Sequence, residues 1–162
     1  MAKENIVVTE IKNVAKAIYE TIRKQEQPDI EMPIRSLSNV SYDEKEGYFK
    51  ILSKVKTRTL TASTIKTFAQ TLRMMGLSKQ LIETDDIATK REAYYVSKNW
   101  NDARFKEQPE SDAVMDDIEA MMRVNREKIG FVPEEKGGAV AGELFVIHKD
   151  SETGANLEID FT

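Results

Sequence analysis

The sequence contains 162 residues, 40% of them hydrophobic, so it is long enough to form an ordinary domain with a buried core. It has no cysteine, which excludes disulfides and thiolate metal sites. No apolar run approaches the roughly 18 residues of a membrane span, and the N-terminus lacks the apolar stretch of a signal peptide. We therefore expect a cytoplasmic protein that makes no membrane contact.

The net charge of -4 hides a strong asymmetry along the chain. Between Lys50 and Lys106 there are 12 Lys and Arg against 5 Asp and Glu, a net charge of +7 that leaves -11 for the rest. A basic centre between acidic flanks is typical of a surface that binds a polyanion, although chance clustering of solvated lysines gives the same count. The sequence therefore predicts a nucleic-acid-binding face in the middle of the chain.

The first predicted helix follows a frayed end, Met1–Val8, and runs from Thr9 as its N-cap to about Lys24. Its apolar residues recur at helical spacing and form one stripe, made of Ile11, Val14, Ala15, Ile18 and Ile22. The opposite face is charged. Such a helix either packs on its own domain or docks on a partner, and the pattern leaves both possibilities open.

A β-hairpin is predicted next, with strands Ser38–Tyr42 and Tyr48–Leu52 joined by the polar turn Asp43–Gly47. A further strand, Lys54–Thr59, alternates basic residues with small or apolar ones. Successive side chains of a strand point to opposite faces, so three cations would share one face and could contact phosphates. These cations are Lys54, Lys56 and Arg58.

Three short helices should follow this strand. The first is capped by Thr61 or Ser63 and ends at Gly76, the second begins at Ser78, and the third is Ala88–Trp100. Helices in this arrangement, with strands before them and a basic surface, indicate an α+β fold that contains a helix-turn-helix or winged-helix module. The third helix would be the one presented to DNA.

The third helix carries two adjacent tyrosines, Tyr94 and Tyr95. Residues three and four positions apart share a helix face, so Arg91 should lie beside both. A phenol, with a reference pKa of about 10, attacks phosphorus when a neighbouring cation stabilises the developing charge, and arginine binds phosphate oxygens in a bidentate way. The spacing does not choose between the two tyrosines, and tyrosine pairs on helices are more often packing residues.

The segment TKREAYY resembles the active-site segment of the topoisomerase VI A subunit, whose family includes the transesterase that makes meiotic double-strand breaks. The family pattern is an arginine, an acidic residue, a variable position, an aromatic residue and the catalytic tyrosine, which Arg91, Glu92, Ala93, Tyr94 and Tyr95 match in order. MPIRSLSN, VKTRTLTASTIKTFAQTLRMM, QPESDAVMDDIEAM and KGGAVAGEL also resemble this subunit. The resemblance implies that Tyr95 is the nucleophile and that Arg91 stabilises the phosphate.

The resemblance also implies an ATP-dependent type IIB DNA topoisomerase, built from two A and two B subunits, that cleaves and rejoins double-stranded DNA through a 5′-phosphotyrosyl link. ATP would bind to the B subunit, which the N-terminal segment of the A subunit contacts. Mg²⁺ would be held by a Toprim domain beyond Thr162, so we expect this chain alone to have little or no activity. The candidate DNA-binding residues are Lys54, Lys56, Arg58, Lys90 and Lys98.

Beyond the tyrosines, Pro109 ends a polar segment and Ser111 is predicted to cap a helix with an apolar face of Val114, Met115, Ile118, Met121 and Met122. This helix also carries Asp112, Asp116, Asp117 and Glu119. Adjacent carboxylates on a helix point about 100° apart, so no metal site is predicted. Glu143–Lys149 and Leu157–Phe161 should form a second hairpin, in which His148 is expected to be an exposed or packing residue.

These predictions divide the chain into three parts. Residues 1–27 form a helix that could contact a partner, residues 28–108 form a winged-helix domain that bears the tyrosine, and residues 109–162 form a helix and a hairpin that lead toward a Toprim domain. Two other functions stay open. The chain could be a non-catalytic winged-helix DNA binder, or a module that mainly docks another subunit through its first helix.

Overall fold

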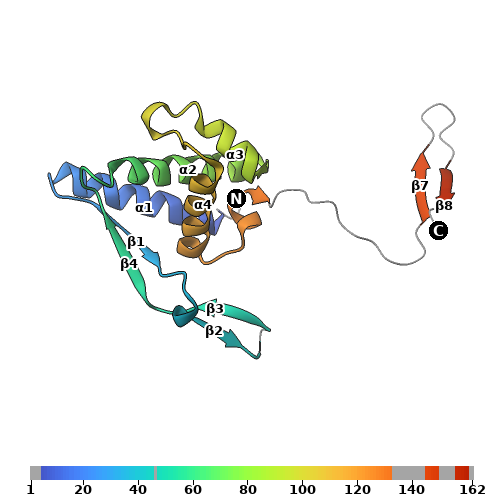
Figure 1. Cartoon of the computed structure of the whole chain (residues 1–162), viewed down its shortest axis with the longest axis horizontal. Helices are drawn as coiled ribbons and strands as arrows, with labels where there is room; N and C mark the ends of the chain where they lie inside the picture. The colour runs from blue at the N-terminus through green and yellow to red at the C-terminus, as the bar shows by residue number, and fades with distance from the viewer. Residues whose placement is uncertain (1–4, 46, 133–144, 150–155, 161–162) are drawn as a thin grey trace.

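The computed structural model describes residues 5–45, 47–132, 145–149 and 156–160, which form helices and strands in an α+β arrangement (Figure 1). The helices are α1 (Ile6–Arg23), α2 (Ile65–Thr84), α3 (Lys90–Ser97) and α4 (Gln108–Met122), with short 3-10 turns at Leu37–Asn39, Asn101–Ala103 and Arg126–Ile129. The strands are β1 (Asp29–Pro33), β2 (Val40–Asp43), β3 (Tyr48–Ile51), β4 (Val55–Thr59), β5 (Ala88–Thr89), β6 (Phe131–Val132), β7 (Phe145–Lys149) and β8 (Asn156–Asp160).

Two antiparallel strand pairs form one long β-ribbon, residues 29–59, that extends from the helices with β2 and β3 at its far end (Figure 1). β1 pairs with β4, with Asp29 opposite Thr59, and β2 pairs with β3, with Val40 opposite Ile51. The predicted hairpin is therefore confirmed. The strand predicted at Lys54–Thr59 also forms, and its partner is β1, which the sequence analysis did not identify.

The break between the two strand pairs of the β-ribbon is closed by one buried amide, that of Asn39. Its Nδ2 donates to the carbonyl oxygens of Ile34, at 2.8 Å, and Lys54, at 2.9 Å. Its Oδ1 accepts from the backbone N–H of Lys54 at 3.0 Å. Asn39 is fully buried, so this side chain replaces backbone hydrogen bonds that the strands do not make at this point.

Helix α1 starts earlier than the sequence predicts. The side chain of Asn5 caps it by accepting from the N–H of Val7 at 2.9 Å, whereas the hydroxyl of Thr9 lies inside the helix and donates to the carbonyl of Asn5. The prediction of a cap at Thr9 after a frayed end is therefore wrong, because the first turn packs in the core. The buried side chains of α1 are Val7, Val8, Ile11 and Ile18.

Helix α2 is continuous through Gly76, so the predicted stop at Gly76 and the separate helix from Ser78 are wrong. A glycine inside a helix costs about 1 kcal/mol. Burial on both sides offsets that cost, because Met74, Met75, Ser78 and Leu81 are all buried. The hydroxyl of Ser78 also donates to the carbonyl of Ile129 at 2.7 Å. The helix ends at Asp85, whose φ of 53° is left-handed.

Helix α4 begins at Gln108, with Glu107 as the N-cap residue and Pro109 in its first turn. Proline is favoured there because the first helical N–H groups have no intrahelical acceptor. The predicted cap at Ser111 is wrong, since Ser111 lies inside the helix and is buried. The predicted apolar face is present, with Val114, Met115 and Ile118 buried and Met121 and Met122 packed against the core.

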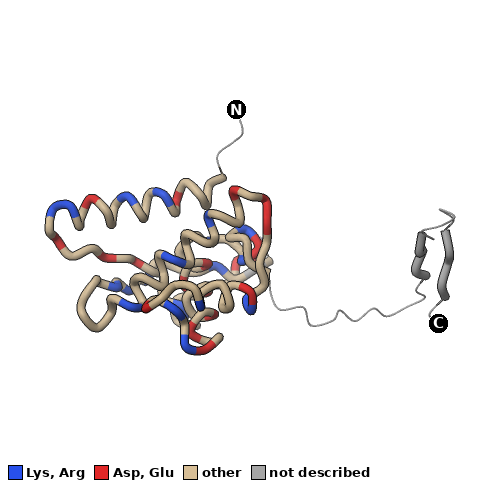
Figure 2. Tube along the Cα trace, turned by 90° about the horizontal axis from the view of Figure 1, so that it is seen from above, with Lys and Arg blue, Asp and Glu red and all other residues tan. Residues whose placement is uncertain are grey.

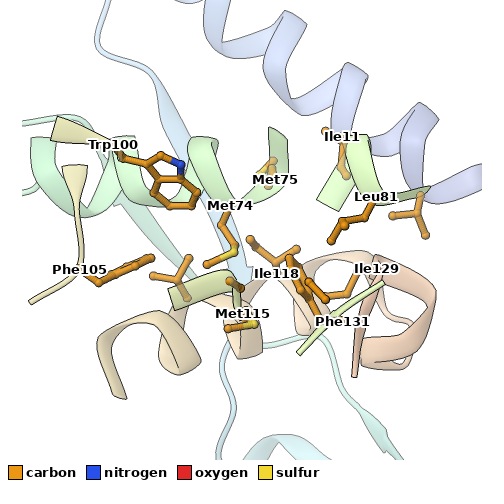
Figure 3. Close-up of a cluster of buried hydrophobic side chains, with 14 residues drawn as sticks. Ile11, Met74, Met75, Leu81, Trp100, Phe105, Met115, Ile118, Ile129 and Phe131 are labelled. Atoms are coloured by element: carbon orange, nitrogen blue, oxygen red, sulfur yellow. The ribbon is translucent and has the colours of Figure 1, made fainter. Parts of the chain in front are cut away.

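The main hydrophobic core lies between the four helices and β6 (Figure 3). Its largest side chains come from all three predicted parts of the chain and include Ile11, Met74, Met75, Leu81, Trp100, Phe105, Met115, Ile118, Ile129 and Phe131. The predicted boundaries after residues 27 and 108 therefore do not separate hydrophobic cores. A smaller cluster of Ile18, Ile30, Met32 and Phe68 attaches the β-ribbon to α1 and α2.

Two further strand pairs complete the described structure. β5 and β6 are parallel, with Ala88 opposite Phe131, and this pairing places the start of α3 on the core. β7 and β8 are antiparallel, with Phe145 opposite Asp160, and His148 lies in β7. Residues 150–155, which would hold the turn of the predicted second hairpin, lie outside the described residues. No helix in the described part of the chain has the length and apolar character that a bilayer crossing requires.

Candidate active site

The tyrosine-bearing helix α3 is fixed at its start by a capping box. The hydroxyl of Thr89 accepts from the N–H of Glu92 at 3.1 Å, and the Glu92 carboxylate accepts from the N–H of Thr89 at 2.6 Å. One face of the helix is anchored by Ala93 and Ser97, which are fully buried. The Thr-x-x-Glu signature of this box is visible in the sequence and could have set the helix start more accurately.

The two tyrosines of α3 occupy different environments. The Tyr94 ring packs against the main core, and its hydroxyl donates to the carbonyl of Lys106 at 3.0 Å. Tyr95 is 53% exposed. The ring centroids are 5.5 Å apart, so the two rings are in contact although Tyr94 faces the core and Tyr95 faces the solvent. The structure therefore separates two residues that the spacing could not distinguish.

Arg91 lies beside Tyr95, as the helical spacing predicts. Its Nη2 is 3.5 Å from the Tyr95 hydroxyl oxygen, and its Cζ lies 5.8 Å from the centroid of the Tyr95 ring. A guanidinium at this position can stabilise negative charge on a phenol oxygen and bind the oxygens of an approaching phosphate. The pair thus presents a hydroxyl and a cation together on the solvent side of α3.

All four of the predicted DNA-binding lysines, Lys54, Lys56, Lys90 and Lys98, have partners within the chain. Lys98 donates from Nζ to the carbonyls of Phe105, at 2.8 Å, and Lys106, at 3.3 Å. The Nζ of Lys90 is 3.9 Å from a carboxylate oxygen of Asp112, and Lys54 donates to the carbonyl of Ser38 at 3.3 Å. Lys90 and Lys54 make long contacts, whereas Lys98 is held closely.

Lys56 and Arg58 share one face of β4, as predicted, but this face is turned toward α4. Arg58 Nη2 is 3.1 Å from one carboxylate oxygen of Asp117, and Lys56 Nζ is 3.5 Å from the other. Arg58 also donates to the hydroxyl of Thr71 at 3.1 Å. Asp117 is only 5% exposed. The sequence pattern predicted no metal site at this acid and gave no sign that it is the counter-ion of β4.

Asp117 belongs to an ion-pair cluster that joins the β-ribbon to α4 and the 3-10 turn after it. Arg35 contacts Asp116 at 2.9 Å and Asp117 at 3.2 Å, while Arg126 contacts Asp116 and Glu119. We call these residues the ion-pair cluster: Arg35, Lys56, Arg58, Asp116, Asp117, Glu119 and Arg126. Its carboxylates are surrounded by cations, so they do not fit a magnesium site. Within the described residues, no group of three or more Asp, Glu or His side chains is arranged so that it could hold a metal ion.

In the view of Figure 2, basic and acidic positions are interspersed over the described part of the backbone trace. The cations that give the central segment its net charge of +7 therefore lie in two different environments. On β4, the cations face Asp117. On α3, Arg91 lies against the exposed Tyr95.

Comparisons with known proteins agree with the resemblance of the active-site segment. Residues 66–131, which contain α3, α4, all of α2 except its first residue, and both tyrosines, match a family model described as type IIB DNA topoisomerase. The chain is 48% identical over 162 residues to the A subunit of the type 2 DNA topoisomerase 6 from Methanocaldococcus jannaschii. It is 32% identical over 156 residues to the corresponding protein from Methanothermobacter thermautotrophicus, and 30% over 155 residues to that of Pyrococcus abyssi.

These alignments cover 100%, 96% and 93% of the chain but only 42%, 44% and 40% of the three relatives. The chain thus spans about two fifths of the length of the relatives it matches. The region common to all of these matches includes the helix that bears Arg91 and Tyr95. By its sequence, the chain belongs to the family of topoisomerase VI A subunits.

Proposed function

We propose that this chain is the DNA-contacting, nucleophile-bearing part of a type IIB DNA topoisomerase A subunit. The observation that carries the proposal is the exposed hydroxyl of Tyr95 beside the guanidinium of Arg91, on a helix that the family match includes. The Tyr95 oxygen attacks a backbone phosphorus and loses its proton. The bond from phosphorus to the 3′ oxygen breaks, that oxygen takes up a proton, and the 5′ phosphate becomes an ester of Tyr95. Resealing is the reverse reaction.

Arg91 has two tasks in this mechanism. It binds the phosphate oxygens before attack and stabilises the negative charge that builds up on the phenol and phosphate oxygens during attack. The acids of the ion-pair cluster do not fit Mg²⁺, so we assign the metal to a Toprim domain elsewhere in the full-length protein, and ATP to a B subunit. In this proposal two A and two B subunits act together on double-stranded DNA, in the cytoplasm, and the 162-residue chain alone has little or no cleavage activity.

The DNA surface in this proposal is a winged-helix module with α3 turned toward the duplex. The long contacts of Lys54 and Lys90 leave their ammonium groups able to exchange a weak internal partner for a phosphate. Lys56 and Arg58 can contribute only if they are released from Asp117. Of the candidate residues, Arg91 lies beside the nucleophile, and Lys54 and Lys90 would add further phosphate contacts.

The nucleophile is tested in a topoisomerase VI whose A subunit carries this chain as the matching segment, called here the reconstituted enzyme. Tyr95→Phe should abolish the covalent adduct with 3′-labelled duplex DNA, trapped by denaturant and resolved by gel, because the 3′ label stays on the fragment whose 5′ phosphate is linked to the tyrosine. Tyr94→Phe should still form an adduct, because the Tyr94 hydroxyl is bonded to a backbone carbonyl. An adduct that survives Tyr95→Phe and disappears with Tyr94→Phe would refute the assignment.

The DNA surface is tested separately on the 162-residue chain by fluorescence anisotropy with a labelled duplex across a salt series. We expect log K to fall linearly with log salt, because phosphate contacts release counterions. Tyr95→Phe should leave this binding nearly unchanged. Absence of any binding at low salt would remove the DNA-contacting role from this segment.

A subunit-docking role has an observation of its own in α1. Tyr19 and Ile22, which are three positions apart and therefore neighbours on this helix, are each more than half exposed, while Val7, Val8, Ile11 and Ile18 of α1 are buried. Apolar residues on the solvent side of a helix are typical of a docking surface. Replacing Tyr19 and Ile22 by serine should weaken capture of the B subunit while DNA binding by the chain stays the same. Capture at wild-type strength would argue against docking through α1.

A further inference from the structure

We propose that Lys98 and Tyr94 are positioning residues that hold the ring of Tyr95 in place, and that Lys98 does not act as a phosphate contact. The proposal rests on the proposed function of Tyr95 as the nucleophile. It differs from the sequence prediction, which assigned Lys98 to DNA binding and left Tyr94 as an alternative nucleophile.

The backbone of Lys106 is a point at which α3 is clamped to the rest of the domain. Its carbonyl oxygen accepts from the Tyr94 hydroxyl at 3.0 Å and from Lys98 Nζ at 3.3 Å. Its N–H donates to the Glu110 carboxylate, in the first turn of α4, at 2.9 Å. Both backbone polar groups of this residue are thus bonded to side chains: the carbonyl to Tyr94 and Lys98 at the end of α3, and the N–H to Glu110 of α4. This arrangement ties α3 to α4 through the intervening loop.

The ammonium of Lys98 is already surrounded by favourable partners. It donates to the carbonyl of Phe105 at 2.8 Å as well as to that of Lys106, and it lies 4.0 Å from the centroid of the Tyr94 ring. An ammonium has three N–H donors, and the face of an aromatic ring attracts a cation. A phosphate would therefore have to displace existing partners of Lys98.

The loop held by this clamp is itself fixed on the core. Phe105 is fully buried, and its ring lies 5.8 Å from that of Trp100, which is also buried. The carbonyl oxygens that Lys98 contacts therefore belong to a segment with little freedom to move. A side chain bonded to such a segment is held in one orientation, and in this case it fixes the Tyr94 ring in turn.

The position of the Tyr94 ring matters because it forms one side of the site of Tyr95. The two ring centroids are 5.5 Å apart, and the Arg91 guanidinium carbon lies 5.8 Å from the centroid of the Tyr95 ring. The exposed phenol thus has a fixed aromatic neighbour as well as a cation. Misplacing a reacting group by about 1 Å can reduce a rate about 100-fold, so this restraint bears directly on attack at phosphorus.

The test uses the reconstituted enzyme with Lys98→Met, which removes the ammonium and keeps the length of the side chain. Two quantities are measured: the single-turnover rate of adduct formation at saturating DNA, and the DNA affinity across a salt series. We expect the rate to fall about 10- to 100-fold, with the affinity and its salt slope unchanged. Lys98→Arg should recover most of the rate, because a guanidinium can also donate to both carbonyls.

Lys79→Met is the matched control, since this lysine on α2 pairs with Glu83 on the same helix and makes no contact with the clamp. Its rate and affinity should equal those of the wild type. Far-ultraviolet circular dichroism of the 162-residue chain with Lys98→Met should show a folded protein, so that a lower rate reports on positioning.

The competing role gives the opposite pattern. If Lys98 contacts a phosphate, Lys98→Met lowers the salt slope by about one and weakens binding, while the rate at saturating DNA is unchanged. That pattern, or no change in either quantity, would overturn the positioning role. An adduct that persists with Tyr95→Phe would overturn the proposed function together with this inference. Loss of adduct with Tyr95→Phe but a normal rate with Lys98→Met would overturn this inference alone.

Discussion

The cations of β4 and the cation beside Tyr95 belong to the same basic stretch of sequence, but the fold gives them different surroundings. Lys56 and Arg58 face a carboxylate that is almost fully buried, and Arg58 is bonded to a threonine as well. Arg91 lies against an exposed phenol on the first turns of α3. One group holds the β-ribbon to α4, whereas the other is placed at the solvent face. A count of basic residues therefore overestimates the surface available to DNA.

The largest expected effect concerns Arg91. In the reconstituted enzyme, Arg91→Lys should reduce the single-turnover rate of adduct formation about 100- to 1,000-fold, because an ammonium cannot replace a planar fork of donors next to the phenol oxygen. The rate is measured at saturating DNA, so that weaker binding does not contribute. If Arg91→Lys reacted at nearly the wild-type rate, the guanidinium of Arg91 would not be needed for attack. The difference between Arg91 and the cations of β4 would then have no effect on the reaction.

The second effect concerns the cluster that neutralises β4. Asp117→Asn should lower the free energy of unfolding of the 162-residue chain by about 2–3 kcal/mol, because three cations, Arg35, Lys56 and Arg58, lose their buried counter-ion. The measurement is urea denaturation followed by circular dichroism. The same variant should bind duplex DNA more tightly, with a steeper salt slope, since Lys56 and Arg58 become available to phosphates.

Glu31→Gln is the control for Asp117→Asn, because it removes the same charge from an exposed position of β1. It should leave both the stability and the salt slope close to those of the wild type. Equal changes in the two variants would mean that net charge, and not the ion-pair cluster, governs the binding.

Substitutions at two glycines change the stability of the domain without changing its charge, so they separate the two effects on DNA binding. Gly130 has a φ of 84°, and a Cβ there would lie 2.9 Å from the Cβ of Leu81, so Gly130→Ala should destabilise the chain by about 1–3 kcal/mol. Gly76 lies in α2 with open space around its Cα, so Gly76→Ala should stabilise it by about 0.5–1 kcal/mol. Thermal unfolding checks both. Neither change should alter the salt slope of DNA binding, and a slope that followed stability would undermine the electrostatic contrast.

The smallest effect compares neighbours on the β-ribbon. Lys54→Gln should reduce the salt slope by about 0.9, the value expected for one lost phosphate contact, because Lys54 is exposed and has only a long bond to a carbonyl. Lys56→Gln should reduce it by less, since Lys56 faces Asp117. The measurement is anisotropy across a salt series with each variant. Equal reductions would show that Asp117 does not restrain Lys56 when DNA is present.

Local patterns in the sequence predicted much of this fold. The hairpin of β2 and β3, the buried face of α4 and the neighbourhood of Arg91 and Tyr95 all follow from side-chain periods of two and 3.6 residues. These features depend on residues that are close in sequence, so their geometry is fixed by the local backbone. The capping box at Thr89 was equally accessible and went unnoticed.

Long-range packing decided the features that the sequence analysis missed. Gly76 does not end α2, because the residues around it are buried against segments that are distant in sequence. Asp117 reaches the cations of β4 across 59 positions of the chain. Lys98 donates to two backbone carbonyl oxygens, and the order of side chains in the sequence does not predict such a backbone partner. Sequence spacing identifies which residues share a face, but not which group lies opposite that face.

The buried amide of Asn39 limits which amino acids position 39 can tolerate. Its side chain uses two donor hydrogens and one acceptor on three backbone groups inside the β-ribbon. Aspartate lacks the donors, leucine lacks both functions, and glutamine carries the same group one methylene further out. Natural selection should therefore remove substitutions at position 39 as strictly as it removes substitutions in the main hydrophobic core. In a library of random variants, this polar position on an arm distant from Tyr95 would be among the least tolerant.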